Sequence, residues 1–133
     1  MPKRLLSSVK IFYPDYSPTQ LVGMIQKRLP ALEKALSLKR VVLFGSWAVG
    51  RETAFSDIDL MVIYNGPPRE EAYKLVRHFL KLRGLEPHVY TEEQAEKLKA
   101  TLDRMTRQGI ILFPKPSPTD RPSLRNKNMR KTK

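Results

Sequence analysis

Two short apolar runs joined by a turn-rich segment place the strongest constraint on how this chain can fold. Val41–Phe44 is wholly apolar and partly β-branched, and Ile58–Tyr64 is a second such run. Runs of this length and composition predict buried strands. The segment between them begins with Gly45 and closes with Asp57, so residues that carry chemistry lie directly at the two strand ends.

The segment before the first strand predicts one long helix. Ser17 and Pro18 form an N-cap and a first-turn proline, and apolar residues then recur at helical spacing as far as Leu36. Pro30 interrupts this run, so we expect it to kink the helix or divide it in two. Upstream, Val9–Tyr13 fits either a short strand or an extended arm.

The segment after the second strand alternates between helices and strands. Asn65–Pro68 is a turn, Thr91 is an N-cap, and Gly84 and Gly109 precede the last two strands. The predicted elements are helices over Glu70–Arg83 and Thr91–Gln108 and strands over Leu85–Tyr90 and Ile110–Phe113. This alternation predicts an α/β (α+β) fold with a small mixed sheet packed against helices.

The segment that joins the two strands carries the residues most suited to bind a ligand or take part in a reaction. Gly45 lets a phosphate approach the backbone, and Ser46 adds a hydroxyl and the N–H groups of the following turn. Ten residues later, Asp57 and Asp59 lie two apart at a strand start, so both carboxylates point to the same side. Paired carboxylates repel unless a cation lies between them, and hard oxygen ligands suit Mg²⁺. Either motif alone means little, but their conjunction between two apolar strands predicts phosphoryl or nucleotidyl transfer.

This segment resembles the Gly-Ser-x10-Asp-x-Asp signature of the minimal nucleotidyltransferases, small members of the polymerase-β-type nucleotidyltransferase superfamily. The resemblance covers Leu43–Tyr64 in detail and residues 17–113 by the order of elements. It implies that Gly45 and Ser46 contact the triphosphate of ATP or another NTP, while Asp57 and Asp59 hold two Mg²⁺ ions. It also implies a small all-helical HEPN partner in a toxin–antitoxin module, which some of these enzymes adenylylate from ATP.

The third carboxylate of the family pattern is altered. By register His88 stands where that aspartate is expected, and Glu86 lies two residues earlier on the same face. Glu86 can replace the missing metal ligand if the strand shifts, and His88 can serve as the base near neutral pH. The alternative is that both are merely polar residues at an exposed strand end. Pro87 between them removes a backbone donor, which predicts an edge strand or a bulge.

A second departure lies just after the Gly-Ser turn. Val49 stands where many relatives carry arginine before the glycine. Arg51 is the expected replacement as a phosphate contact, with an exposed surface arginine as the alternative. Trp47 lies next to the turn and is expected to pack in the core, with stacking on a nucleotide base as the alternative.

The charge is strongly positive and unevenly distributed. The 133-residue chain has a net charge of +12. Residues 114–133 contribute seven basic residues and one acid, a charge of +6, and residues 1–113 contribute the other +6 (18 minus 12). We therefore expect a folded domain over residues 1–113 and a flexible, basic, proline-rich tail over 114–133. Such charge favours polyanions, including nucleic acid at the tail, although a solvated basic surface is equally compatible.

Composition excludes several other classes. The chain has no cysteine and only two histidines, so disulfides, thiolate metal sites and structural zinc are not expected. No apolar run is long enough to span a bilayer, and the N-terminus lacks a signal-peptide pattern. These features predict a soluble cytoplasmic protein with no membrane association.

Three functions remain open at this point. The leading interpretation is a Mg²⁺-dependent nucleotidyltransferase that transfers a nucleoside monophosphate, AMP from ATP, to a hydroxyl of a partner protein. The alternative is a non-catalytic antitoxin that neutralises a HEPN partner by contact, and the altered third position favours it. Nucleotide addition to RNA is suggested only by the basic tail, since no aromatic-rich RNA-binding element accompanies it.

Overall fold

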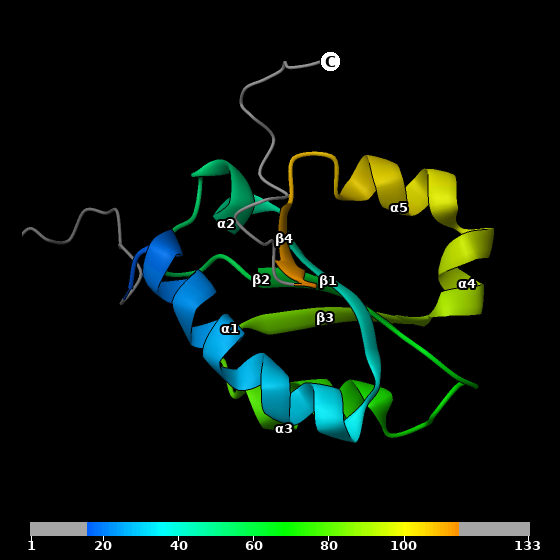
Figure 1. The fold of residues 1–133 in the computed structure, drawn as a ribbon. Helices are drawn as coiled ribbons and strands as arrows, with labels where there is room; N and C mark the ends of the chain where they lie inside the picture. The colour runs from blue at the N-terminus through cyan, green and yellow to red at the C-terminus, as the bar shows by residue number, and fades with distance from the viewer. Residues whose placement is uncertain (1–15, 115–133) are drawn as a thin grey trace, which may run out of the picture.

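The computed structural model describes residues 16–114, so Val9–Tyr13 and the tail after Pro114 lie outside the described part. Within it, a four-stranded sheet has helices against both faces (Figure 1). In chain order the elements are α1 (Pro18–Ala35), β1 (Leu38–Phe44), α2 (Ser46–Val49), β2 (Ile58–Tyr64), α3 (Ala72–Leu80), β3 (Leu85–Thr91), α4 (Glu92–Lys97), α5 (Lys99–Met105) and β4 (Ile110–Phe113). No helix of this part is long and apolar enough to cross a membrane.

The sheet has the strand order β3-β2-β1-β4. β1 is antiparallel to both β2 and β4, whereas β2 and β3 are parallel, which confirms the predicted mixed sheet. The end of β1 therefore lies beside the starts of β2, β3 and β4. We call this end, where β1 leads into Gly45, the Gly45 end of the sheet.

Each face of the sheet contributes to its own apolar cluster. Side chains of α1 and α3 pack with one set of alternating strand residues, which includes Leu43, Ile58 and Leu60. The opposite set, which includes Phe44 and Met61, packs with Ala95 of α4 and Leu102 of α5. Because nearly every residue of β2 is buried, these strands read as continuous apolar runs rather than as alternating ones. We call the face that carries Phe44 and Met61 the α5 face.

Helix α1 begins where the sequence predicts but is not divided. Ser17 and Gln20 form a reciprocal capping box, each side chain accepting a hydrogen bond from the other's backbone N–H. Pro30 is expected from the sequence either to kink the helix or to divide it; the helix continues through Pro30 to Ala35, so the division does not occur. Pro30 is exposed, and a proline on the solvent side leaves the unpaired carbonyl of the preceding turn in contact with water.

Two other helix boundaries differ from the prediction. α3 ends at Leu80 rather than Arg83, because Lys81 takes a left-handed φ of 48° and its N–H bonds the Arg77 carbonyl. The single helix expected over Thr91–Gln108 is two helices that meet at Leu98. Leu98 has φ −102° and ψ 18°, which turns the chain so that both helices pack a side chain on the same face of the sheet.

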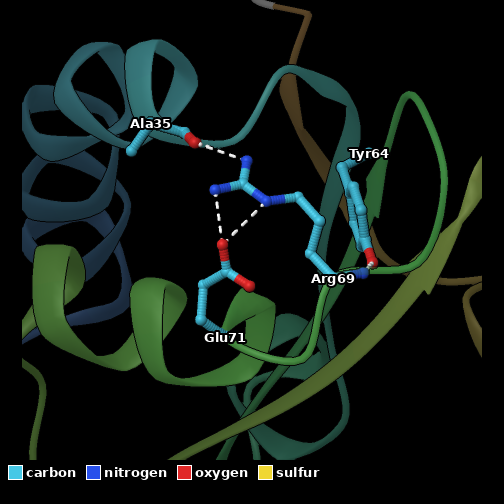
Figure 2. A network of polar contacts seen from close by, with 4 residues as sticks. All are labelled: Ala35, Tyr64, Arg69 and Glu71. Atoms are coloured by element: carbon cyan, nitrogen blue, oxygen red, sulfur yellow. Dashed lines mark hydrogen bonds and ion pairs between the residues drawn. The ribbon is translucent and has the colours of Figure 1, made fainter.

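A polar network closes the end of the sheet opposite Gly45 (Figure 2). The Arg69 guanidinium donates to the Ala35 carbonyl at 2.8 Å and to Glu71 Oε2 at 2.7 and 3.0 Å, and the Arg69 N–H donates to the Tyr64 hydroxyl. Arg69 therefore links the last turn of α1, the end of β2 and the segment before α3. The backbone N–H and the Arg69 guanidinium lower the pKa of the exposed Glu71 carboxyl below its usual value.

Candidate active site

Gly45 has a backbone conformation and a packing environment that only glycine satisfies. Its φ of 78° and ψ of −155° fall in a region that side chains with a Cβ essentially do not enter. A Cβ built at this position would lie 2.4 Å from Asp59 Oδ2 and 3.2 Å from Asp59 Cγ. The Asp59 carboxylate thus lies directly against the Gly45 backbone, and the two halves of the sequence signature meet here.

The turn after Gly45 is held by backbone bonds. Ser46 begins the short helix α2 and is half-buried, and the Ser46 carbonyl accepts hydrogen bonds from the N–H groups of Gly50 and Arg51. Gly50 closes the turn in a left-handed conformation with φ 79°. Trp47 is buried in the core and packs on the Tyr16 ring, as expected from the sequence.

The two aspartates occupy different environments at the start of β2. Asp59 lies within the strand, pairs with Phe44 of β1 and has a side chain that is 29% exposed. Asp57 precedes the strand, is exposed, and lines a cavity of about 450 Å³ together with Lys81 and Arg83. Their carboxylate oxygens are the donors that Mg²⁺ prefers, so the pair fits this ion chemically.

β3 places Glu86 and His88 on the α5 face, which is also the face of Asp59. Glu86 is the register partner of Asp59 and His88 is the partner of Met61, in an unbroken parallel pairing. The edge position expected from Pro87 is confirmed, and the pairing carries no bulge at this residue. The register therefore places both side chains on the Asp59 side of the sheet.

The His88 side chain lies close to the Asp59 carboxylate. Its Nε2 atom is 3.5 Å from Asp59 Oδ1, is buried, and has no hydrogen-bond partner among the described residues. The imidazole ring also packs on Phe44, with ring centroids 5.1 Å apart. Glu86 is exposed. Within residues 16–114, no three acidic or imidazole side chains form a group that could hold a metal ion, so Glu86 as a third ligand stays a prediction.

The structure therefore brings together only part of the predicted site. Gly45, Asp59 and His88 are in close proximity, and Glu86 is next to Asp59 through the strand pairing. Arg51 is exposed and lines neither the cavity beside Asp57 nor a cavity of about 400 Å³ beside Gly45. Its predicted role as a phosphate contact gains no support from its position.

Sequence reasoning did not identify a second cavity at the Gly45 end of the sheet. It measures about 400 Å³, and its lining residues come from the Gly45 turn and from the end of α5 and the following turn. They are Phe44, Gly45, Val49, Arg104, Met105, Arg107, Gln108 and Gly109. Gly109 before the last strand was an available signal, but it indicated only a turn.

A Gly-Ser turn packed against an Asp-x-Asp strand at one end of a mixed sheet defines a protein of the nucleotidyl-transfer class. Residues 25–115 match the family model described as the nucleotidyltransferase domain, and the chain belongs to this family. The family resemblance inferred from the Gly-Ser and Asp-x-Asp motifs is thereby confirmed, and so is the prediction of a nucleotidyltransferase.

Three individual proteins are similar to large parts of this chain. The chain is 31% identical over 78 residues to the "putative protein adenylyltransferase" of Methanocaldococcus jannaschii, covering 56% of this chain and 78% of the relative. Among solved structures, a "putative nucleotidyltransferase" from Sulfolobus solfataricus has a TM-score of 0.49 at 19% identity, covering 71% of this chain and 80% of that one. The toxin–antitoxin complex MntA–HpeT has a TM-score of 0.47 at 17% identity, covering 79% and 77%.

Proposed function

We propose that this protein transfers AMP from ATP, in a Mg²⁺-dependent reaction, to a hydroxyl group of a partner protein in the cytoplasm. The observation that carries this proposal is the contact between Asp59 and Gly45, where an added Cβ would lie 2.4 Å from the carboxylate. It joins the phosphate-binding turn to the acidic pair, as nucleotidyl transfer requires. The name of the M. jannaschii relative supports a protein as the acceptor.

Some residues of the site would bind phosphate and others would bind the cation. Gly45, whose missing side chain leaves room for the Asp59 carboxylate, contacts the triphosphate through its backbone, and the Ser46 hydroxyl donates a hydrogen bond to a phosphate oxygen. Asp57 and Asp59 would hold Mg²⁺, which when bound neutralises the charge that develops on the phosphate oxygens. Whether one or two ions bind depends on Glu86, because the two aspartates alone offer few ligands.

The acceptor side of the site lies on β3. In the reaction, the acceptor oxygen forms a bond to the α-phosphorus, the bond to the bridging oxygen breaks, and pyrophosphate leaves. The hydroxyl proton passes to a base on the protein. His88 is the candidate for this base, because its buried Nε2 lies next to Asp59 and has no other partner among the described residues. Glu86 is the exposed register partner of Asp59 and is the candidate to bind the metal beside it.

The partner protein follows from the family resemblance. Minimal nucleotidyltransferases pair with small helical HEPN proteins, and we extend this pairing to the present chain. β3 is an edge strand, so an acceptor side chain can approach Glu86 and His88 without displacing another strand. Such open access suits a macromolecular acceptor rather than an enclosed small molecule.

A transfer assay with matched variants tests the proposal. The protein is incubated with each α-labelled NTP, Mg²⁺ and a purified small helical protein of the HEPN type, and label on that protein is measured. We expect labelling from ATP, with loss of at least 100-fold in Asp59→Asn, the effect expected for removing a transition-state charge contact. Asp103→Asn, an exposed acid on α5 that pairs only with Lys99 among the described residues, is the control and should retain full activity.

The same assay decides the alternative of a binding-only antitoxin. The altered third position, where Glu86 is exposed and His88 half-buried, is the observation that favours it. If the wild type neutralises its partner without labelling it, and Asp59→Asn neutralises equally well, the enzymatic proposal is wrong.

A further inference from the structure

The cavity beside Gly45 has a distinctive charge. Among the described residues, the charged side chains that line it are Arg104 and Arg107, and no acid does so. Gly45 and Val49, from the turn that we propose to bind phosphate, line the same cavity. Two arginines and this turn therefore border one space of about 400 Å³.

The topology brings these arginines to the site although they lie some 60 residues further along the chain. Arg104 is in the last turn of α5, and Arg107 follows in the turn that leads into β4. β4 pairs antiparallel with β1, with Ile110 opposite Leu43. The turn from α5 to β4 must therefore lie at the Gly45 end of the sheet.

Close packing of Gly109 fixes this turn. A Cβ at Gly109 would lie 2.6 Å from Val42 Cγ1 and 2.9 Å from the Leu43 carbonyl oxygen, so any larger residue would push the turn away from β1. The Gly109 N–H also donates to the Thr106 carbonyl at 2.9 Å, and the Thr106 hydroxyl donates to the Leu102 carbonyl. These contacts hold the backbone from which Arg107 projects.

One residue of the cavity lining, Phe44, also contacts the acidic part of the site. Phe44 lines the cavity and also packs on His88, which lies 3.5 Å from Asp59. Phe44 is on the α5 face, so the arginines lie on the same side of the sheet as the Asp59 carboxylate. A ligand bound at Asp59 and Gly45 can extend toward α5 without crossing the sheet.

From this arrangement we propose that Arg104 and Arg107 bind the phosphate chain of the nucleotide. Guanidinium groups donate paired hydrogen bonds to phosphate oxygens and stay charged at any physiological pH. The inference rests on the proposed function and adds its phosphate-binding side chains, the role that the sequence assigned to Arg51. Because the contact is to phosphate, it contributes equally to the binding of all four NTPs and leaves base selection to other residues.

Direct binding measurements test this assignment. Calorimetric titrations with ATP, inorganic tripolyphosphate and adenosine are compared in the wild type, Arg104→Gln, Arg107→Gln and the double variant. Lys74→Gln, an exposed position on α3 on the opposite face, removes the same charge and serves as the control, and Arg51→Gln tests the competing residue. The domain should fold in every variant, because all of these side chains are exposed.

We expect the affinity for ATP and tripolyphosphate to fall by about tenfold for each arginine removed, about 1.4 kcal/mol each, and to depend less steeply on salt. Adenosine binding and the Lys74→Gln control should be unchanged. If ATP and tripolyphosphate bind equally well to the double variant, or if only Arg51→Gln weakens them, the inference is wrong. Transfer activity that is lost in Asp59→Asn but unchanged in the double variant would retain the proposed function and refute only the arginine assignment.

Discussion

Replacing Gly45 with alanine gives the sharpest test of how the site is built. The added methyl group must adopt a φ of 78° with ψ near −155°, which costs about 1–3 kcal/mol for a residue with a Cβ. It must also displace Asp59 Oδ2, which would lie only 2.4 Å away, and overpacking of this kind costs about 1–3 kcal/mol. The sum is roughly 2–6 kcal/mol, a large part of the roughly 5–15 kcal/mol typical of a domain.

Gly50 offers a matched control five residues away. It has nearly the same φ, 79°, but no described atom lies within 4 Å of the position that a Cβ would take there. Gly50→Ala should therefore cost only the left-handed backbone term, about 1–2 kcal/mol. Urea unfolding followed by circular dichroism measures both variants, and activity at full folding shows whether Asp59 has moved. We expect Gly45→Ala to be inactive even where it is folded and Gly50→Ala to remain active.

A double-mutant cycle separates the steric term from the backbone term. Asp59→Ala removes the two atoms closest to the added methyl and leaves only the Asp59 Cβ, at 3.3 Å. Gly45→Ala should therefore cost less in the Asp59→Ala background, by about 1 kcal/mol or more. Equal costs in both backgrounds, together with equal losses for the Gly45 and Gly50 variants, would refute the described contact.

Three further predictions address other parts of the molecule. The pKa of Glu71 is lowered in the folded state, so its interaction with Arg69 stabilises the fold above the unfolded pKa and is lost as the pH falls through the folded pKa. In Glu71→Gln, the free energy of unfolding measured by urea titration should therefore fall less steeply with decreasing pH than in the wild type. Gly109→Ala should lower the free energy of unfolding by about 1–3 kcal/mol, because its Cβ would overlap β1; an unchanged urea midpoint would contradict the described packing. His88→Gln should lower kcat by at least tenfold, because the proposed base is lost, and Glu86→Gln should instead weaken the dependence of the rate on Mg²⁺ concentration. An unchanged kcat in the first variant and an unchanged Mg²⁺ dependence in the second would show that neither residue acts in the reaction.

The sequence predicted the elements whose signals are local. The apolar run Ile58–Tyr64 matches β2 at both ends, and the caps at Ser17 and Thr91 were identified because their side chains bond residues three positions away. The ends of α3 and the break at Leu98 were missed. The helix ends and the break depend on how the helices pack against the sheet, and residues close in sequence do not determine that packing.

In the candidate site, too, the features with local signals were predictable and those that depend on tertiary contacts were not. Gly45, Asp59 and the face of Glu86 and His88 were predictable, because alternation along two strands and a glycine turn fix them. The arginine cavity was not, because Arg104 reaches the site only through the pairing of β4 with β1. Arg51 was chosen because it is close to the turn in sequence, yet proximity along the chain does not bring it to the cavity that Arg104 and Arg107 line.

The unbroken pairing of β2 with β3 makes the chemistry depend on the core. Side chains alternate along a strand, so a slip of one residue would move Asp59 to the face of α1 and α3 and bring Ile58 to the face of the site. Both faces are packed, so such a slip would bury a carboxylate among leucines, which is strongly unfavourable. The apolar packing on both faces therefore selects the one register of β2 and β3 that keeps Asp59 at the site. Core substitutions that weaken this register preference can consequently abolish activity, although they change no residue of the site.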